Sequence, residues 1–322
     1  MPSSRFPSRL VPVVLLLAPE YRHRRAAGAA SLEYRHRRAA IAASLAVGLV
    51  LFVSHYPGVV ARPSQHLPVI ASLEYRHRRA AIAASLQASS PTAPTPPVPR
   101  GVLNTPAFAG TVVRQVRLPA GQKLIALTFD DGPWPVTTEK VLDILHQYNA
   151  RATFFWIGKN LARYPRIAQR VVEGGHAVGN HTWSHPYTPV SPAAAAREVD
   201  PTAALIARDT QVSTWLFRPP GGNLKTGVAR YALSKGYTVV MWSVSSADTD
   251  PKAPWTAFAD NVLKGARPGS IVLMHDGGGN RSRTVEALPV ILAGLQQQGY
   301  RFVSVPELLA HSEPLGGQAT SR

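Results

Sequence analysis

A short apolar run that ends in two adjacent carboxylates places the strongest constraint on the fold of this chain. Residues Leu124–Thr128 are apolar or β-branched and predict a buried strand, and Gly132-Pro133 predicts a turn after it. The strand therefore carries Asp130 and Asp131 at its carboxyl end, which is the edge where ligands bind in parallel α/β sheets. Two neighbouring carboxylates repel each other, so the pair indicates a bound cation or acid/base chemistry. An isolated Asp-Asp-Gly is more often a solvated turn, and the other strand ends must decide between these interpretations.

From about residue 111 onwards, strand-like and helix-like patterns alternate. Alternation of this kind predicts a parallel sheet, which seven or eight units would close into a barrel. The strand-like runs are Leu124–Phe129, Thr153–Trp156, His176–Asn180, Trp215–Arg218, Thr238–Ser243, Ile271–His275 and a weaker run at Phe302–Val305. The helical patterns lie near 137–148, 163–174, 192–208, 226–235, 255–264 and 284–298.

Composition excludes several classes of protein. The chain has 322 residues, of which 45% are hydrophobic, enough for one large core beside an N-terminal extension. It contains no cysteine, so disulfides and thiolate metal sites are excluded. Most of the net charge of +17 lies in residues 1–120, which hold 15 Lys+Arg against 3 Glu. This distribution, with no nucleic-acid-binding motif, argues against a nucleic-acid partner and for a membrane-proximal extension.

The extension, residues 1–86, combines repeats with an apolar segment. The EYRHRRAA sequence occurs three times at irregular spacing, which indicates a duplicated segment more than a solenoid. Residues 39–61 carry no Lys, Arg, Asp or Glu and follow an arginine cluster, so they predict a signal peptide or membrane anchor; a buried soluble helix is the alternative. We therefore expect an exported protein, anchored on the outer side of the inner membrane, or periplasmic or secreted if the segment is cleaved.

The rest of the chain divides at a proline-rich linker. Residues 87–110 are rich in Pro, Ser, Thr and Ala and predict an extended spacer. Residues 111–312 form the predicted catalytic domain, and residues 313–322 a tail. No oligomeric state is predicted.

Two histidines follow the predicted strand at His176–Asn180. His181 and His185 are four residues apart, a spacing that brings two imidazoles to one point on a helical turn or in a tight loop. A lone pair of this kind is weak evidence for a metal. Here it ends a strand of the same sheet as Asp130 and Asp131, and two imidazoles with a carboxylate form a three-ligand site with room for water.

Two further strands end in polar residues. Arg218 is permanently charged and, beside a carboxylate, keeps that carboxylate ionised; in the Pro-Pro-Gly-Gly turn that follows, the N–H of Gly221 can point at a ligand. His275 ends the strand at Ile271–His275, and Asp248 can orient its imidazole by accepting the second N–H.

These residues resemble the five ordered motifs of the polysaccharide deacetylases, the NodB-homology or carbohydrate esterase family 4 group. The motifs are Thr128–Pro133, His181–His185, Arg218–Gly221, Asp248 and Leu273–His275, and the similarity spans about residues 120–310. The resemblance implies a distorted (β/α) barrel of about seven parallel strands. It also implies metal-dependent hydrolysis of N-acetyl or O-acetyl groups on a glycan such as peptidoglycan or chitin, a reaction at non-peptide carbon–nitrogen bonds in the first case.

The resemblance also assigns a metal site. It implies Asp131, His181 and His185 as ligands of a divalent metal, with zinc expected and cobalt or nickel as alternatives. The partner would be an acetylated polysaccharide, with the membrane as a second partner through the N-terminal segment.

The remaining roles follow from the same resemblance. It implies Asp130 as general base with Arg218 as its partner, and His275 as general acid with Asp248 as its partner. Leu273 would form a wall for the acetyl methyl group. The chemistry of the reaction adds one role, since the N–H of Gly221 would stabilise the oxyanion together with the metal.

Three positions depart from the family pattern. Gly221 stands where a tyrosine is usual, Ser245 where an aspartate braces the arginine, and Thr249 where a tryptophan follows the second aspartate. Two alternatives to a glycan deacetylase therefore stay open. One is a metal-dependent amidohydrolase acting on a small non-sugar amide, and the other is a catalytically silent glycan-binding protein of the cell envelope.

Overall fold

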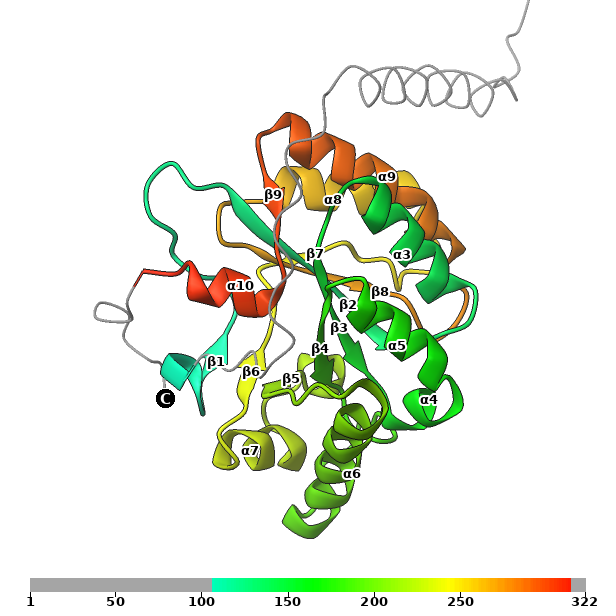
Figure 1. Ribbon diagram of the computed structural model, residues 1–322, viewed down its shortest axis with the longest axis vertical. Coiled ribbons are helices and arrows are strands. Elements are labelled where there is room, and N and C mark those ends of the chain that lie inside the picture. The colour runs from blue at the N-terminus through cyan, green and yellow to red at the C-terminus, as the bar shows by residue number, and fades with distance from the viewer. Residues whose placement is uncertain (1–105, 314–322) are drawn as a thin grey trace, which may run out of the picture. The chain divides into compact units, whose positions relative to one another are not determined.

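The computed structural model describes residues 106–313, which form a curled parallel sheet surrounded by helices (Figure 1). The predicted signal or anchor segment at 39–61, the repeats, most of the linker and residues 314–322 lie outside this range. Within it, no helix combines the length and apolar character needed to cross a membrane. The packed structure begins slightly before the predicted domain start, since the short 3₁₀ helix η1 (Pro106–Phe108) buries Phe108 in the core.

Nine strands make up the sheet in the described residues. Their order is β1-β6-β5-β4-β3-β2-β8-β7, with β9 paired to β2, and every ladder is parallel. Their bounds are β1 (Val112–Val113), β2 (Leu124–Gly132), β3 (Ala152–Trp156), β4 (Ala177–Asn180), β5 (Leu216–Phe217), β6 (Thr238–Val240), β7 (Val244–Ser245), β8 (Ile271–His275) and β9 (Arg301–Phe302).

A single chain segment links the two sides of the sheet. β6 pairs with β5, whereas β7, only a few residues later, pairs with β8 at the other end of the strand order. An isolated antiparallel bridge between Gln115 and Ser270 joins the chain after β1 to the start of β8. The sheet therefore curls into a distorted barrel, as the strand-and-helix alternation predicted.

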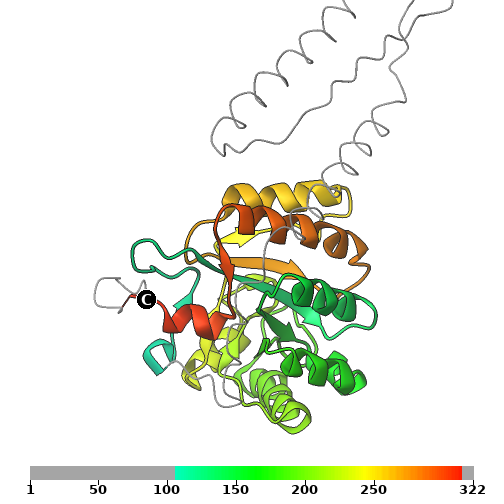
Figure 2. The same ribbon diagram turned by 45° about the horizontal axis from the view of Figure 1, so that its top comes forward.

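Helices cover the outer face of the sheet. Neighbouring pairs include α8 and α9, α3 and α9, α5 and α6, and α6 and α7; Figures 1 and 2 show α8 and α9 lying side by side. The helices are α3 (Thr137–Gln147), α4 (Gly158–Arg163), α5 (Pro165–Glu173), α6 (Pro192–Thr210), η2 (Pro220–Gly222), α7 (Gly227–Ser234), α8 (Trp255–Gly265), α9 (Ser282–Gln297) and α10 (Val305–Ala310).

The alternation of side chains along β2 divides the core into two layers. Ile125, Leu127 and Phe129 belong to the cluster beneath the outer helices, whereas Leu124 and Ala126 belong to the cluster inside the barrel. Since successive side chains point to opposite faces, Thr128 and Asp130 continue the inward row. Helix α10 contributes Val305, Leu308 and Leu309 to the same inner cluster, which places an apolar plug at the amino-terminal ends of the strands. The polar inward residues therefore gather at the carboxyl ends.

Three of the predicted elements differ from the structure. The run Thr238–Ser243 was predicted as one strand but forms only β6, since the chain then crosses to β8 and starts β7. The helix expected at 163–174 is α5, which begins at Pro165 after Tyr164, and the short helix α4 before it was not predicted. The weaker run at Phe302–Val305 stops at Phe302, because Ser304 caps α10 and accepts from the N–H of Glu307.

His176 should make the stability of the fold depend on pH. Its Nδ1 accepts the N–H of Ala152 at 3.2 Å, and burial, followed by the charge of Arg151, lowers its pKa to about 4. The unfolded chain, with a histidine pKa of about 6.5, takes up the proton first, so the free energy of unfolding falls as pH drops from 6.5 towards 4, by about 3 kcal/mol from this residue. His176→Asn retains an acceptor without the titration, so we expect a smaller pH dependence in urea denaturation of the metal-free protein. An equal dependence in both proteins would contradict this role.

Candidate metal centre and active site

Asp131 lies near the end of β2, where strand alternation alone would point its side chain to the outer face with Phe129. Its backbone is instead left-handed, with a φ of 74°, and its carboxylate lies beside the imidazoles of His181 and His185. The amide of Asn160, on α4, donates to the carbonyl of Asp131 at 2.8 Å. The strand end is therefore fixed through the backbone, and the carboxylate is left available.

His181 and His185 lie in the loop after β4, which is not helical. Thr182 and His185 both have positive φ, and Asn180 holds the turn by accepting the N–H of Thr182 at 2.9 Å. The hydroxyl of Thr182 in turn accepts the N–H of His185 at 3.0 Å. Glu198, on α6, accepts from both the N–H and the hydroxyl of Ser184. This compact loop brings the two imidazoles together, with ring centroids 4.9 Å apart.

These three side chains form a cluster suited to a cation. Their donor atoms all lie within 4.8 Å of one another, and Nε2 of each histidine lies 3.4–3.6 Å from Oδ1 of Asp131. That Oδ1 is buried and has no hydrogen-bond partner. The carbonyl of Arg218 lies 2.7 Å from Nδ1 of His181, an arrangement that fixes the proton there and turns the Nε2 lone pair towards the cluster. Two imidazoles and one carboxylate suit a zinc-type divalent metal with open positions.

Burial keeps His181 neutral. The side chain is wholly buried, and burial is the main cause that lowers its pKa to about 3. A neutral imidazole is the form that binds a metal, so this site does not need to lose a proton from His181 before metal binding at ordinary pH.

Asp130 forms a buried ion pair with Arg218. Nη1 of Arg218 donates to Oδ1 of Asp130 at 2.6 Å and to the hydroxyl of Thr128 at 2.8 Å. The other oxygen of Asp130 lies 3.7 Å from Nε2 of His181, so this carboxylate faces the metal cluster while the arginine fixes its orientation.

Arg218 is held inside the barrel on all sides. Its Nε and Nη2 donate to the carbonyls of Val240 and Met241 at 2.9 and 3.3 Å, and its guanidinium lies over the ring of Phe155 at 4.1 Å. Burial lowers its pKa and the charge of Asp130 opposes this shift. The aspartate expected near position 245 is therefore not needed as a brace, because backbone carbonyls take the guanidinium donors; Ser245 is exposed and accepts from Ala247 instead.

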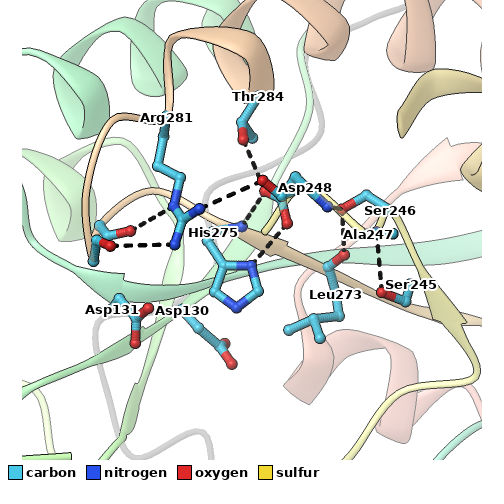
Figure 3. A network of polar contacts seen from close by, with 12 residues as sticks. Asp130, Asp131, Ser245, Ser246, Ala247, Asp248, Leu273, His275, Arg281 and Thr284 are labelled. Carbon is cyan, nitrogen blue, oxygen red and sulfur yellow. Dashed lines mark hydrogen bonds and ion pairs between the residues drawn. The ribbon is translucent and has the colours of Figure 1, made fainter. Parts of the chain in front are cut away.

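On β8, beside Asp130, His275 is held by Asp248 through two hydrogen bonds (Figure 3). Oδ1 of Asp248 lies 2.8 Å from Nδ1 of the imidazole, and its Oδ2 accepts the backbone N–H of His275, also at 2.8 Å. Thr284, at the start of α9, donates to the same Oδ2. The ring is thus fixed with Nε2 free, and the β2–β8 register places His275 directly beside Asp130.

The charges of this pair determine its protonation. Burial alone lowers the pKa of His275, but the hydrogen bond and charge of Asp248, then Asp130 and Asp131, outweigh it, so the pKa lies above its ordinary value. For Asp248 burial raises the pKa, and the contacts with His275 and Thr284 outweigh it in the opposite direction. An imidazolium held by an ionised carboxylate is the arrangement expected of a general acid.

Three other predicted positions lie at the same rim. Leu273 is one inward step before His275 on β8, and Figure 3 shows both side chains on the same side of the strand. Gly221 lies in η2 with a φ of 59°. Thr249 is exposed next to Asp248.

Several residues around the site were not anticipated from the sequence. Asp276 is wholly buried, its pKa is raised to about 7 by burial, and it accepts from the hydroxyl of Thr138 at 2.5 Å beneath Gly132. Arg281 contacts the loop after β8, and Thr284 and Asn160 support site residues as described. Asp276 adjoins His275 in sequence, which was the only signal for it; the others lie outside any motif.

Comparison with known proteins agrees with this geometry. The family model described as polysaccharide deacetylase matches residues 117–240. A peptidoglycan-N-acetylglucosamine deacetylase of Bacillus cereus is 43% identical over 195 residues, which cover 60% of this chain and 92% of that protein. The chain belongs to the polysaccharide deacetylase family. Its members are hydrolases, and the distorted barrel predicted from the resemblance is confirmed.

Other relatives show how far this family membership extends. The peptidoglycan-N-acetylmuramic acid deacetylase PdaC of Bacillus subtilis is 35% identical over 58% of this chain and 39% of its own length. The crystal structure of the Bc1960 peptidoglycan N-acetylglucosamine deacetylase, bound to 4-naphthalen-1-yl-N-oxidanyl-benzamide, superposes with a TM-score of 0.58 and 32% identity, covering 63% of this chain and 94% of that one. The crystal structure of BA3943 of Bacillus anthracis, a pseudoenzyme of carbohydrate esterase family 4, superposes with a TM-score of 0.56 and 27% identity, covering 62% of this chain and 69% of that one.

The cluster around Asp131 should bind one class of ligand, a divalent metal. We expect His185→Ala to weaken zinc binding by more than about 100-fold, since one of three ligands is lost. Isothermal titration of the metal-free full chain measures this, and His146→Ala, at an exposed position on α3, is the control. Unchanged affinity in the His185 variant would argue against a metal at this cluster.

Proposed function

We propose that this protein removes acetyl groups from N-acetylglucosamine units of peptidoglycan, with a divalent metal, zinc in the first place, held by Asp131, His181 and His185. The observation that carries the proposal is that a carboxylate and an imidazole, each held by its own partner, lie side by side next to that cluster. Arg218 holds Asp130, which faces His181, and Asp248 holds His275 beside Asp130. One carboxylate and one imidazole, each with a fixed partner, are what a hydrolysis needs on the two sides of the scissile bond.

The metal supplies Lewis acidity and lowers the pKa of water, to about 7 in favourable zinc sites. In our proposal Asp130 accepts the proton of the attacking water, through the oxygen that Arg218 does not bind. Arg218 compensates the charge of Asp130 and keeps its carboxylate pointing at the cluster. Arg218 does not itself act as an acid or a base, because a guanidinium keeps its proton in proteins.

His275 then delivers a proton to the leaving nitrogen from Nε2. Its Nδ1 proton is committed to Asp248, so only Nε2 is free to face the substrate. The raised pKa of His275, caused mainly by the hydrogen bond and charge of Asp248, favours the protonated imidazole. The N–H of Gly221 is the proposed donor to the carbonyl oxygen as it becomes negative, and Leu273 is the proposed apolar wall for the methyl group.

A glycan substrate fits the surface around the cluster. Tyr187, two residues after His185, is 75% exposed. Its ring packs edge-on against the His185 imidazole, with the ring centroids 4.7 Å apart. Gly221 contributes no side chain there, and a Cβ at this position would lie 3.8 Å from the tyrosine ring. A fixed, exposed aromatic beside a flat backbone suits the face of a sugar ring. It does not resemble the closed apolar pocket that a small amide would favour.

The relatives narrow the substrate class and the location. Those at 43% and 35% identity are named peptidoglycan deacetylases, one of N-acetylglucosamine and one of N-acetylmuramic acid, and a further relative is a bifunctional xylanase/deacetylase. Peptidoglycan as substrate places this protein at the cell envelope or outside the cell. A membrane anchor at residues 39–61 stays a prediction, since that segment lies outside the described residues.

The assay for acetate release tests the proposal. The full chain, loaded with zinc, should release acetate from peptidoglycan, and Asp130→Asn should lower kcat about 10²–10⁴-fold while metal stays bound, because asparagine cannot accept the proton. Asp143→Asn, on the exposed face of α3, is the matched control and should retain activity. Chitin oligomers and acetylated xylan serve as comparison substrates. Zinc binding with no release from any of the three would reject the proposed function and favour a silent glycan-binding protein.

The pH profile tests the proposed acid. His275 acts when protonated, so kcat/KM should fall on the alkaline side of its raised pKa. Asp248→Asn removes the main cause of that rise, so the alkaline limb should move to lower pH and kcat should fall. Asp250→Asn, at an exposed position nearby, is the control and should leave the limb in place. An unmoved limb in Asp248→Asn would show that another group sets it.

A further inference from the structure

Arg281 joins two loops that meet at the active site (Figure 3). It precedes α9, and its guanidinium donates to three carbonyls on two segments of the chain. Nε donates to Gly277 at 2.7 Å and Nη2 to Gly278 at 3.4 Å, both in the loop after β8. Nη1 donates to the carbonyl of Asp248 at 3.4 Å. The residue therefore bridges two segments that lie about thirty residues apart in the sequence.

The glycine loop on one side of the bridge packs against Asp131. A Cβ added to Gly278 would collide with Oδ2 of Asp131, and one added to Gly277 would collide with its carbonyl. Gly278 also has a φ of 71°, which favours glycine. The backbone of the loop thus forms the wall behind the proposed metal ligand, and any movement of the loop would change the space in which that carboxylate sits.

The segment on the other side of the bridge holds the proposed acid. Arg281 binds the main chain of Asp248, whose carboxylate makes both contacts with His275. The position of Arg281 therefore affects the orientation of the His275 imidazole through Asp248.

We propose that Arg281 is a positioning residue that holds the metal side and the acid side of the site at a fixed separation. This inference rests on the proposed function for its kinetic consequence. An arginine suits the task because its planar guanidinium presents several donors in a rigid fork, whereas lysine offers a single point charge. Acting only through Asp131 and His275, Arg281 should affect the rate of the chemical step and not the binding of the glycan.

Arg283 is a matched control in the same region. It also bridges carbonyls, those of Ala253 and Asp250, and its guanidinium lies over the ring of Phe258. These contacts tie α9 to the loop before α8 and not to the glycine loop that packs against Asp131. If the arginines only stabilise the start of this helix, variants of both should lose activity. If Arg281 positions the site, only the Arg281 variants should lose activity.

The experiment compares Arg281→Ala, Arg281→Lys and Arg283→Ala in the full chain. We expect kcat for acetate release to fall about 10- to 100-fold in both Arg281 variants with KM changed less than about twofold, and Arg283→Ala to stay within about twofold of wild type. Millimolar guanidinium should restore part of the activity of Arg281→Ala. Zinc affinity, measured without substrate, should weaken about tenfold in Arg281→Ala and stay unchanged in Arg283→Ala.

Each outcome separates the two proposals. Wild-type activity with kcat unchanged in Arg281→Ala, or equal losses in the Arg281 and Arg283 variants, would overturn the positioning role. An inactive wild type would reject the proposed function instead. The zinc affinity would then test the role of Arg281. If Arg281→Ala binds zinc as tightly as wild type, the positioning role is overturned. If only this variant binds zinc more weakly, the result supports positioning of the metal ligand Asp131.

Discussion

The buried ion pair between Arg218 and Asp130 is the constraint on which the rest of this structure depends. Both side chains are inside the barrel, where removing one partner of a buried pair commonly costs about 3–5 kcal/mol because the other charge is left uncompensated. The protein satisfies the remaining guanidinium donors with Thr128 and with the carbonyls of Val240 and Met241. Those carbonyls lie at the end of β6, where the strand expected to run to Ser243 stops and the chain crosses towards β7. The point at which the chain leaves the strand thus coincides with the placement of this charge.

Backbone conformation, more than side-chain identity, gives the site its shape. Asp131, Thr182 and His185 all adopt left-handed φ, and these turns are what bring a carboxylate and two imidazoles from separate strands to one point. Glycines at 277 and 278 leave no room for a side chain behind Asp131. Strained or left-handed positions of this kind are typical of sites where geometry is fixed for a ligand.

Periodicity was sufficient to place the residues that lie where a strand ends. Asp130, Arg218 and His275 all follow apolar runs, and strand alternation predicts that they face inward, whereas the direction of Asp131 depends on its left-handed φ. It was insufficient where the role depends on how a loop folds back. Arg281 and Thr284 follow a glycine-rich stretch whose path cannot be derived from periodicity. Asp276 follows His275 in the sequence, but its burial depends on the turn at Gly132, which packs against its carboxylate. By contrast, the Ser-x-x-Glu capping box at Ser304 was readable in advance and would have corrected the last predicted strand.

The electrostatics of the four carboxyl groups lead to the same assignment as the geometry. Asp130 is matched by the guanidinium of Arg218, and Asp248 by the imidazole of His275. Burial raises the pKa of Asp276 to about 7, so this group needs little positive charge to balance it near neutral pH. Asp131 has no such compensation among the described residues: one of its oxygens is buried without a hydrogen bond, and its neighbour His181 is held neutral by burial. A carboxylate that faces two imidazole nitrogens and lacks a protein cation is suited to a cation from solution, so we propose the metal there and not between the two aspartates of the motif.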